Sequence, residues 1–382
     1  MTSTSREITT ETRVDGSGLK EQVAQQPPLK EKNLFELEVL RGVAMGLILL
    51  AHARPYIEWE PRLAWLIPAP GGVGLSVFFF LSGFLLRRSM YGREQSFSAI
   101  AFLKSRFVRI MPLYWLSILV FVWIFHVAHI FQYEDFSPLL VTTLPHALGL
   151  QLLGAPQSVI FTIWYMGALI PYYLLFAATA RLNLAKYLTV NVLLLAGLYA
   201  LKMFFQQRGI ALLDFRLLMH YPTLLFGVCY AEFDLNMVRV KRSRWVLCGL
   251  FAVLTLVFLQ WCGSAGLDYD NALIAPANFA YYAYSVLGAV AVTGLAFAIA
   301  PLVRKYAALV SVLSVSSYAV YLFHRPVYSL LYDVIVRHVS ESLVLRTLLF
   351  PLMTAVLVWI CYVISRLDTQ WIKPRFTSLL NR

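Results

Sequence analysis

Charged residues are scarce in this sequence. Asp, Glu, Lys and Arg together make up 14% of its 382 residues, whereas hydrophobic residues make up 59%. Soluble domains are about 25% charged. They rarely reach so high a hydrophobic fraction, because a soluble core of this size has too little interior to hide so much apolar surface. The composition therefore excludes a soluble globular enzyme and a disordered scaffold, and it indicates an integral membrane protein.

Cysteine is also scarce. The four cysteines lie in or beside apolar runs and lack the spacing of a metal site: Cys229, Cys248, Cys262 and Cys361. We expect them to be buried packing residues, and we expect neither a disulfide framework nor a bound metal.

A signal peptide is missing from the N-terminal region. Residues 1–32 are polar, rich in Thr, Glu and Gln, and contain no apolar core followed by a small-residue cleavage site. We expect a flexible tail there. Residues 33–366 should then form the membrane domain, and residues 367–382 a short basic cytoplasmic tail.

The formal net charge of +12 belongs entirely to the hydrophobic part of the chain. Residues 1–32 carry five basic and five acidic residues, which leaves 27 Lys and Arg against 15 Asp and Glu in the rest. In a protein with many spans, basic residues mark cytoplasmic loops, so topology explains the excess better than a nucleic-acid partner does.

Long apolar runs follow one another from about residue 34. A bilayer span needs about 20 helical residues, and ten runs approach or exceed that length: 35–54, 71–88, 107–130, 159–180, 184–205, 214–233, 244–262, 279–301, 309–332 and 343–365. The stretch 138–153 is shorter and is interrupted by Pro145 and Gly149, so we expect a re-entrant or interfacial piece. The runs predict an all-α fold of about ten membrane helices, and the bias of Lys and Arg between alternate loops supports ten spans with both termini cytoplasmic.

The first span contains three ionisable residues, Glu38, Arg41 and His52. Such side chains are costly at membrane depth, so a functional interior site is the default interpretation. Arg41 and His52 are three helical turns apart on one face, about 16 Å along the axis, and Glu38 is one turn from Arg41 and able to pair with it. The alternative is that Arg41 reaches the lipid headgroups while His52 caps the span.

Polar residues recur in three further runs. Ser82 and Gly83 form a notch that permits close helix packing or ligand contact. Arg106 and Arg109 lie one helical turn apart on the predicted cytoplasmic side. The preceding run ends on the same side, with Arg87 and Arg88. These four guanidiniums either bind a phosphorylated ligand or determine topology. In the ninth span, the polar side chains of His324-Arg325-Pro326 need polar partners inside the membrane.

The order and spacing of four motifs are typical of one family. The motifs are Glu38-x-x-Arg41-Gly42 with His52 after ten residues, Phe79-Phe80-Leu81-Ser82-Gly83-Phe84, Arg106-x-x-Arg109-Ile110-x-Pro112-Leu113-Tyr114-Trp115, and Ser317-Tyr318-x-x-Tyr321-Leu322-x-His324-x-Pro326. Over roughly residues 34–365 the chain resembles the membrane-bound acyltransferase-3 family, whose bacterial members include O-antigen and exopolysaccharide O-acetyltransferases. Two features depart from some members: Trp164-Tyr165-Met166-Gly167-Ala168 lacks the acid of a Trp-x-Leu-x-x-Glu pattern, and a C-terminal esterase-like domain is missing.

The resemblance implies transfer of an acyl group, expected to be acetyl, from cytoplasmic acyl-CoA to a hydroxyl of an envelope polysaccharide or glycolipid at the bacterial inner membrane. Acyl-CoA would be a co-substrate, with no permanently bound cofactor. The family's essential arginine and histidine correspond to Arg41 and His52.

Acyl transfer to an alcohol needs a base and a cation or donor for the oxyanion. Since imidazole titrates near neutrality, we expect His52 to be the base and Arg41, held by Glu38, to orient the donor or stabilise charge. The remaining expected contacts are with CoA phosphates, from Arg106, Arg109, Arg87 and Arg88, and with substrate, from Ser82, Tyr114, Trp164, Tyr318 and His324.

Other functions remain open. In a transporter or flippase, Arg41, His52 and His324 would line a polar pathway. A polysaccharide polymerase or ligase would need larger non-cytoplasmic loops than those between these spans. Within the acyltransferase hypothesis, an acyl-His52 or acyl-serine relay is an alternative to direct transfer.

Overall fold

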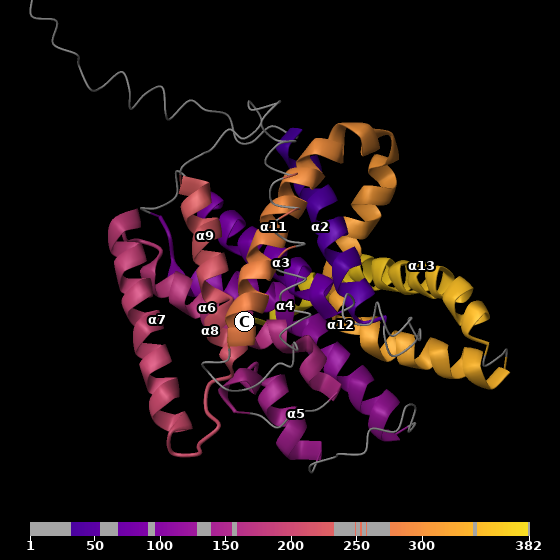
Figure 1. The fold of residues 1–382 in the computed structure, drawn as a ribbon, viewed down its shortest axis with the longest axis horizontal. Helices are drawn as coiled ribbons and strands as arrows, with labels where there is room; N and C mark the ends of the chain where they lie inside the picture. Colours follow the sequence, from indigo (N-terminus) through magenta and orange to yellow (C-terminus); the bar gives the residue numbers. More distant parts are fainter. Residues whose placement is uncertain are drawn as a thin grey trace, which may run out of the picture.

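The computed structural model describes most of the hydrophobic part of the chain: residues 32–53, 68–90, 96–127, 139–154, 159–232, 276–338 and 342–380, together with Gly249, Val253 and Val257. The predicted N-terminal tail, the predicted span 244–262, Cys248 and Cys262 lie outside these residues, apart from Lys32 and those three isolated positions. Every element in the described ranges is helical, so the predicted all-α class is confirmed there (Figure 1).

The first half of the described chain contains three long helices and several short ones. They are α2 (Lys32–Ala51), α3 (Pro68–Arg88), α4 (Ala99–Val122) continued by the π-helical η2 (Trp123–Val127), α5 (Leu139–Ala147), η3 (Gln151–Leu153), η4 (Val159–Ile163) and α6 (Trp164–Thr179). The second half contains α7 (Leu184–Gln206), α8 (Phe215–Met219), α9 (Tyr221–Glu232), α11 (Pro276–Val303), η6 (Arg304–Tyr306), α12 (Ala307–His338), α13 (Leu343–Leu367), η7 (Asp368–Ile372) and α14 (Lys373–Leu380).

Five helical stretches in the described residues are long and apolar enough to cross a membrane. They are Pro70–Arg88, Ala99–Phe125, Leu184–Gln206, Ala280–Ile335 and Thr347–Leu380, and the fourth runs from α11 through η6 into α12. The chain is therefore an integral membrane protein by helix length and composition. The predicted spans 159–180 and 214–233 are each divided between a short helix and a longer one. Ten spans, and the side on which each terminus lies, stay predictions.

Helix α3 lies at the centre of the helical packing, against α2, α9 and α11 (Figure 1). Two glycines bring α3 and α9 into close contact. A Cβ atom at Gly83 would collide with the carbonyl oxygen of Leu224, and one at Gly227 would collide with the carbonyl oxygen of Phe80. The expected notch at Gly83 is thus confirmed as a helix-packing contact.

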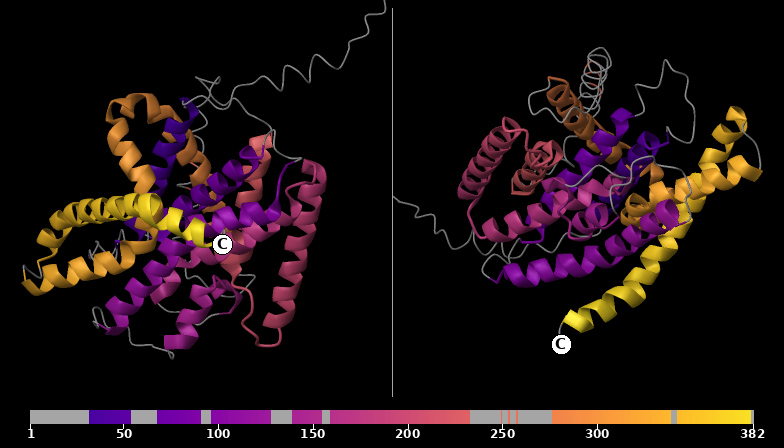
Figure 2. Two further views of the ribbon diagram at one scale, coloured as in Figure 1. Left: turned by 180° about the vertical axis from the view of Figure 1, so that it is seen from behind. Right: turned by 90° about the horizontal axis from the view of Figure 1, so that it is seen from below.

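Helix α12 packs on α2, α4 and α13, and the C-terminal helices return to the body of the molecule. The end of α12 and the start of α13 project together, and α13 then leads back through η7 and α14 to α4 (Figure 2). Phe376 stacks on Phe107 with ring centroids 5.9 Å apart, and Lys104 Nζ donates to the carbonyl of Leu380 at 2.6 Å. The predicted basic tail is helical over residues 368–380 and packs on α4.

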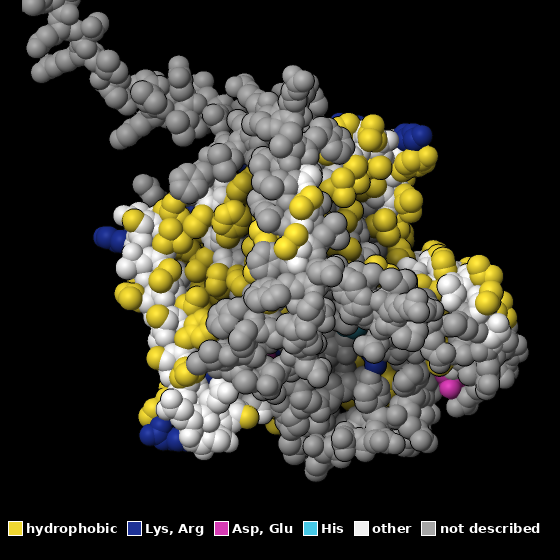
Figure 3. All heavy atoms as spheres, viewed as in Figure 1, with side chains coloured by type: hydrophobic (Ala, Val, Ile, Leu, Met, Phe, Trp, Pro, Cys, Tyr) yellow, Lys and Arg dark blue, Asp and Glu magenta, His cyan; other side chains and the backbone are white. Residues whose placement is uncertain are grey.

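The described surface is largely apolar. Hydrophobic side chains cover much of the part of the face that is not grey in Figure 3, and Lys and Arg appear there at a few places. Helix α7 is typical, because it buries only Tyr187, Asn191 and Lys202 and exposes residues such as Leu193. Surfaces of this kind suit lipid rather than water.

Candidate active site

A cavity of about 410 Å³ lies among α2, α3, α4, α6, α12 and the C-terminal η7–α14 segment. Six of its described lining residues are charged: Glu38, Arg41, Arg106, Arg109, Asp368 and Lys373. The predicted site residues Ser82 and Tyr318 also line it. The structure thus brings together residues from the beginnings of α2 and α4 and from the ends of α3 and α13.

Three arginines that face this cavity make no direct ion pair among the described residues. Arg41, Arg106 and Arg109 all line it, and within the described ranges none of them makes an ion pair or hydrogen bond with the protein. Arg106 is steadied by the rings of Phe102 and Tyr173, at 5.1 and 5.7 Å from its Cζ atom. Guanidiniums gathered in one cavity repel one another, and an anion bound among them would relieve that repulsion.

Glu38 lines the same cavity as Arg41, one turn earlier on α2. The expected direct pairing between the two is not seen, because the ion pairs of the described residues do not include one between Glu38 and Arg41. Glu38 therefore supplies negative charge near Arg41 and leaves the guanidinium's donors available to a ligand.

Hydroxyl groups form the inner wall of the cavity. Ser82 Oγ lies 3.1 Å from Tyr165 Oη, and the hydroxyl of Tyr321 accepts from the backbone N–H of Tyr165 at 3.1 Å. Tyr318 donates to the carbonyl of Ile110 at 2.8 Å and so ties α12 to α4. Tyr165 and Tyr321 were not among the predicted site residues, although both lie inside the sequence patterns that contain Trp164 and Tyr318.

His52 and His324 form a pair beyond the inner end of the cavity. Their ring centroids are 4.6 Å apart in an edge-to-face arrangement. His52 Nδ1 lies 2.8 Å from the carbonyl of Ile48, and His324 Nδ1 lies 2.7 Å from the carbonyl of Tyr321. A carbonyl only accepts, so Nδ1 carries the proton in both rings and Nε2 offers its lone pair. His324 Nε2 is buried and has no hydrogen-bond partner among the described residues.

Neither histidine lines the cavity itself. On α2, Glu38, Arg41 and Met45 line it, and His52 continues the same face seven residues after Met45, about 10 Å further along the axis. On α12, the lining ends at Tyr321, one turn before His324. The histidine pair is therefore outside the cavity and next to its lining residue Tyr321, whose ring centroid is 6.1 Å from that of His324.

Besides the two histidines, four further predicted site residues lie outside the cavity lining. Arg87 donates to the carbonyl of Ala180 at 3.4 Å, and Arg88 packs over the ring of Phe84. The remaining two are buried in polar and aromatic packing. Tyr114 donates to the carbonyl of His146 at 2.7 Å and accepts from Gln151, whereas Trp164 packs on His220 with centroids 5.4 Å apart.

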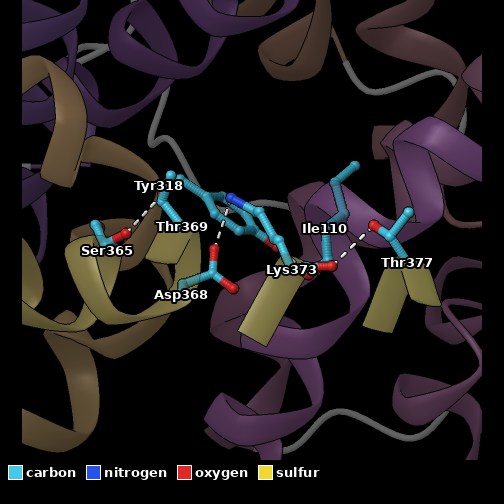
Figure 4. Close-up of polar contacts among 7 residues, drawn as sticks. All are labelled: Ile110, Tyr318, Ser365, Asp368, Thr369, Lys373 and Thr377. Atoms are coloured by element: carbon cyan, nitrogen blue, oxygen red, sulfur yellow. Dashed lines mark hydrogen bonds and ion pairs between the residues drawn. The ribbon is translucent and has the colours of Figure 1, made fainter. Parts of the chain in front are cut away.

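The C-terminal segment contributes two charged residues to the cavity that sequence reasoning missed. Lys373 Nζ lies 2.6 Å from Asp368 Oδ2, beside Tyr318 (Figure 4). No motif marks this pair, because it follows the last apolar run in a stretch that reads as an ordinary polar tail. Only the return of α13 and η7 towards α4 places it beside the arginines.

Comparisons with known proteins identify the family of this chain. An acyltransferase domain family matches residues 34–366, which is most of the chain. A Rhizobium radiobacter protein described as protein 2 in the picA locus is 33% identical over 99 residues, covering 25% of this chain and 46% of that protein. No solved structure matches. The chain spans less than half the length of this curated relative, so the family assignment rests on the domain match. The sequence motifs, the helical membrane architecture and the domain match together show that this chain belongs to the acyltransferase-3 family.

Proposed function

We propose that this membrane acyltransferase moves an acyl group, expected to be acetyl, from cytoplasmic acyl-CoA to a hydroxyl of a cell-envelope polysaccharide or glycolipid. The protein would act in the inner membrane of a bacterium, with both termini cytoplasmic and ten spans. The observation that carries the proposal is the cavity of Arg41, Arg106 and Arg109, adjacent to a histidine pair whose Nε2 atoms are proton acceptors.

The arginine cavity suits the phosphate-bearing end of acyl-CoA. Guanidinium groups bind phosphate oxygens through two parallel hydrogen bonds, and they keep their charge at any physiological pH. The predicted loop charges place the beginnings of α2 and α4 and the end of α13 on the cytoplasmic side. Acyl-CoA would therefore bind from the cytoplasm.

The histidine pair suits the reacting end. Helix α2 extends from Lys32 to Ala51, so Arg41 and His52 are separated by about 16 Å along its axis. A pantetheine arm has comparable length, so a donor whose phosphates contact the arginines can present its thioester near His52. To do so, the arm must displace the side chains between Met45 and the histidine pair.

The transfer step needs one base and one group that stabilises negative charge. The acceptor oxygen attacks the thioester carbon while His52 Nε2 takes the hydroxyl proton, and a tetrahedral oxyanion forms. Collapse breaks the carbon–sulfur bond and expels the CoA thiolate, which receives the proton from His52. His324, whose ring meets that of His52 edge to face, would position this imidazole.

The proposal is tested with purified protein in lipid nanodiscs and with whole cells. Acyl-CoA labelled in its acyl group should lose the label to a glycan fraction of the envelope only when the protein is present. Mass spectrometry of envelope glycans from cells with and without the gene should differ by the mass of one acyl group, which identifies donor and linkage together.

Measuring the release of CoA thiol also distinguishes an acyltransferase from a transporter or flippase. A transporter would move its substrate across proteoliposome membranes without forming free CoA thiol. If neither thiol release nor a missing acyl group were detected, the acyl-CoA proposal would be wrong even though the family assignment would stand.

A further inference from the structure

The C-terminal segment places one more cation in the arginine cavity. We infer that Lys373 is a fourth phosphate ligand of the donor and that Asp368 holds its ammonium in the ligand-free protein. This inference rests on the proposed function, because it concerns how that donor is bound. It makes the segment after the last span part of the binding site.

The partial exposure of Lys373 leaves its ammonium accessible to a second partner besides Asp368. The Asp368 side chain is only 1% exposed, and Lys373 retains 28% of its side-chain surface. Beyond the ion pair, neither carboxylate oxygen of Asp368 has a hydrogen-bond partner among the described residues. A buried carboxylate with so few partners is costly to keep, and a buried pair of this kind is weak evidence for stability.

The backbone holds Lys373 where a ligand among the arginines can reach it. The segment η7 is π-helical, a conformation that is rare and frequent at functional sites. Lys373 then begins α14, and its carbonyl accepts from Thr377 Oγ1 at 2.8 Å. Because α14 packs on α4 through Phe376 and Phe107, the lysine is fixed to the helix that carries Arg106 and Arg109.

The charge balance of the cavity explains why the lysine would change partners. Its described lining holds Arg41, Arg106, Arg109 and Lys373 against two acids. A donor with a diphosphate and a phosphomonoester brings more negative charge than three guanidiniums neutralise. Lysine has a flexible stem and three donors, so it can rotate from one carboxylate oxygen to a phosphate oxygen without movement of the backbone.

The test is equilibrium binding of CoA to full-length protein in lipid nanodiscs. We expect Lys373→Met to raise the Kd for CoA about tenfold and Lys373→Arg to restore most of the affinity, because a charged hydrogen bond to phosphate is lost and regained. Lys305→Met is the matched control, since Lys305 is an exposed lysine of η6 outside the cavity lining, on the same predicted side. Its Kd should equal that of the wild type.

Shortened donors identify which phosphate the lysine contacts. If Lys373 binds the ribose 3′-phosphate, Lys373→Met should leave the Kd for dephospho-CoA unchanged. If it binds the diphosphate, the effect should persist with dephospho-CoA. In either case, transfer from acyl-pantetheine should be equal in the variant and the wild type, whereas the KM for acyl-CoA rises and kcat changes little.

Variants of Asp368 give a second test, in which Lys373→Met can be measured without the folding defect that an unpaired buried charge could cause. Asp368→Asn should lower the Kd for CoA, because the phosphate no longer competes with a carboxylate. In the Asp368→Asn background no buried charge is left unpaired by Lys373→Met, and the Kd should still rise relative to Asp368→Asn alone. Equal Kd values with and without the lysine in both backgrounds would overturn the inference. Failure of the wild type to bind CoA would instead overturn the proposed function.

Discussion

The cavity arginines differ from arginines elsewhere in the chain in what surrounds them. Arg181 donates to the carbonyl of Phe97 at 2.6 Å, and Arg208 lies over the ring of Phe204 and donates to its carbonyl. These contacts use the protein's own acceptors. Arg41 and Arg109 make no comparable contact with described residues, although they lie in the same cavity. A topology role needs only positive charge at a helix end, so it does not explain this gathering of donors.

Replacing Arg109 should weaken donor binding more than turnover. We expect Arg109→Gln to raise the KM for acyl-CoA about tenfold, because one charge-assisted contact to phosphate is lost. Steady-state release of CoA thiol measures this effect. Lys186→Gln, an exposed change at the start of α7, is the control and should leave KM unaltered. An Arg109→Gln enzyme with wild-type KM would contradict a phosphate-binding role.

Replacing His52 should affect chemistry and spare binding. We expect His52→Gln to lower kcat by about 10²- to 10⁴-fold, the usual contribution of a general base, with little change in the Kd for CoA. Single-turnover transfer of labelled acyl groups, measured beside CoA binding, separates the two quantities. Near wild-type transfer would show that another group takes the proton.

At the scale of the element, glycine contacts fix how α3 sits against α9. A methyl group at Gly83 would meet the backbone of α9, which cannot yield as a side chain can. We expect Gly83→Ala to destabilise the fold by about 1–3 kcal/mol and to lower the melting temperature in detergent. Gly197→Ala in α7 is the control, because no atom lies within 4 Å of its added Cβ and alanine favours the helix. Equal melting temperatures would mean that α9 moves freely relative to α3.

Elements whose signal lies in their own composition were predictable. The apolar runs at 71–88 and 184–205 match α3 and α7 closely, because hydrophobicity over 20 residues is a local property. The division of 159–180 into η4 and α6 was not predictable, since the run is uniformly apolar and its break depends on neighbouring helices. Arg41, Arg106 and Arg109 were predicted by their motifs. Lys373 was not, because its place depends on how α13 and α14 return to α4.

At the scale of the whole molecule, the cavity is built from helix ends that the loop charges assign to one membrane side. The ends of α3 and α13 meet the beginnings of α2, α4 and α12 around it. A chain that crosses the bilayer between these ends, as the predicted topology requires, brings them to the same face. The position of the cavity therefore agrees with the charge bias without depending on it.

Accessibility labelling tests this topology. In a background without the four native cysteines, Arg208→Cys, in the connection between α7 and α8, should react with a membrane-impermeant thiol reagent in spheroplasts. Lys305→Cys, between α11 and α12, should react only after the membrane is opened, because the positive-inside rule places it in the cytoplasm. The reverse pattern would invert the assignment of donor and acceptor sides.

The separation of the cavity from the histidine pair has a consequence for the membrane potential of the cell. Under the proposed mechanism, a donor chamber on one face and a proton acceptor near the other would be the two halves of a conduit, and an open conduit would dissipate the membrane potential. In the described residues the cavity lining includes Tyr321 and Met45 but neither His52 nor His324, so under the proposed mechanism the residues between them would act as a seal until the donor binds. Only the incoming pantetheine arm would breach that seal, and it would plug the gap that it makes. Ion leakage and catalysis would thereby be kept apart in time.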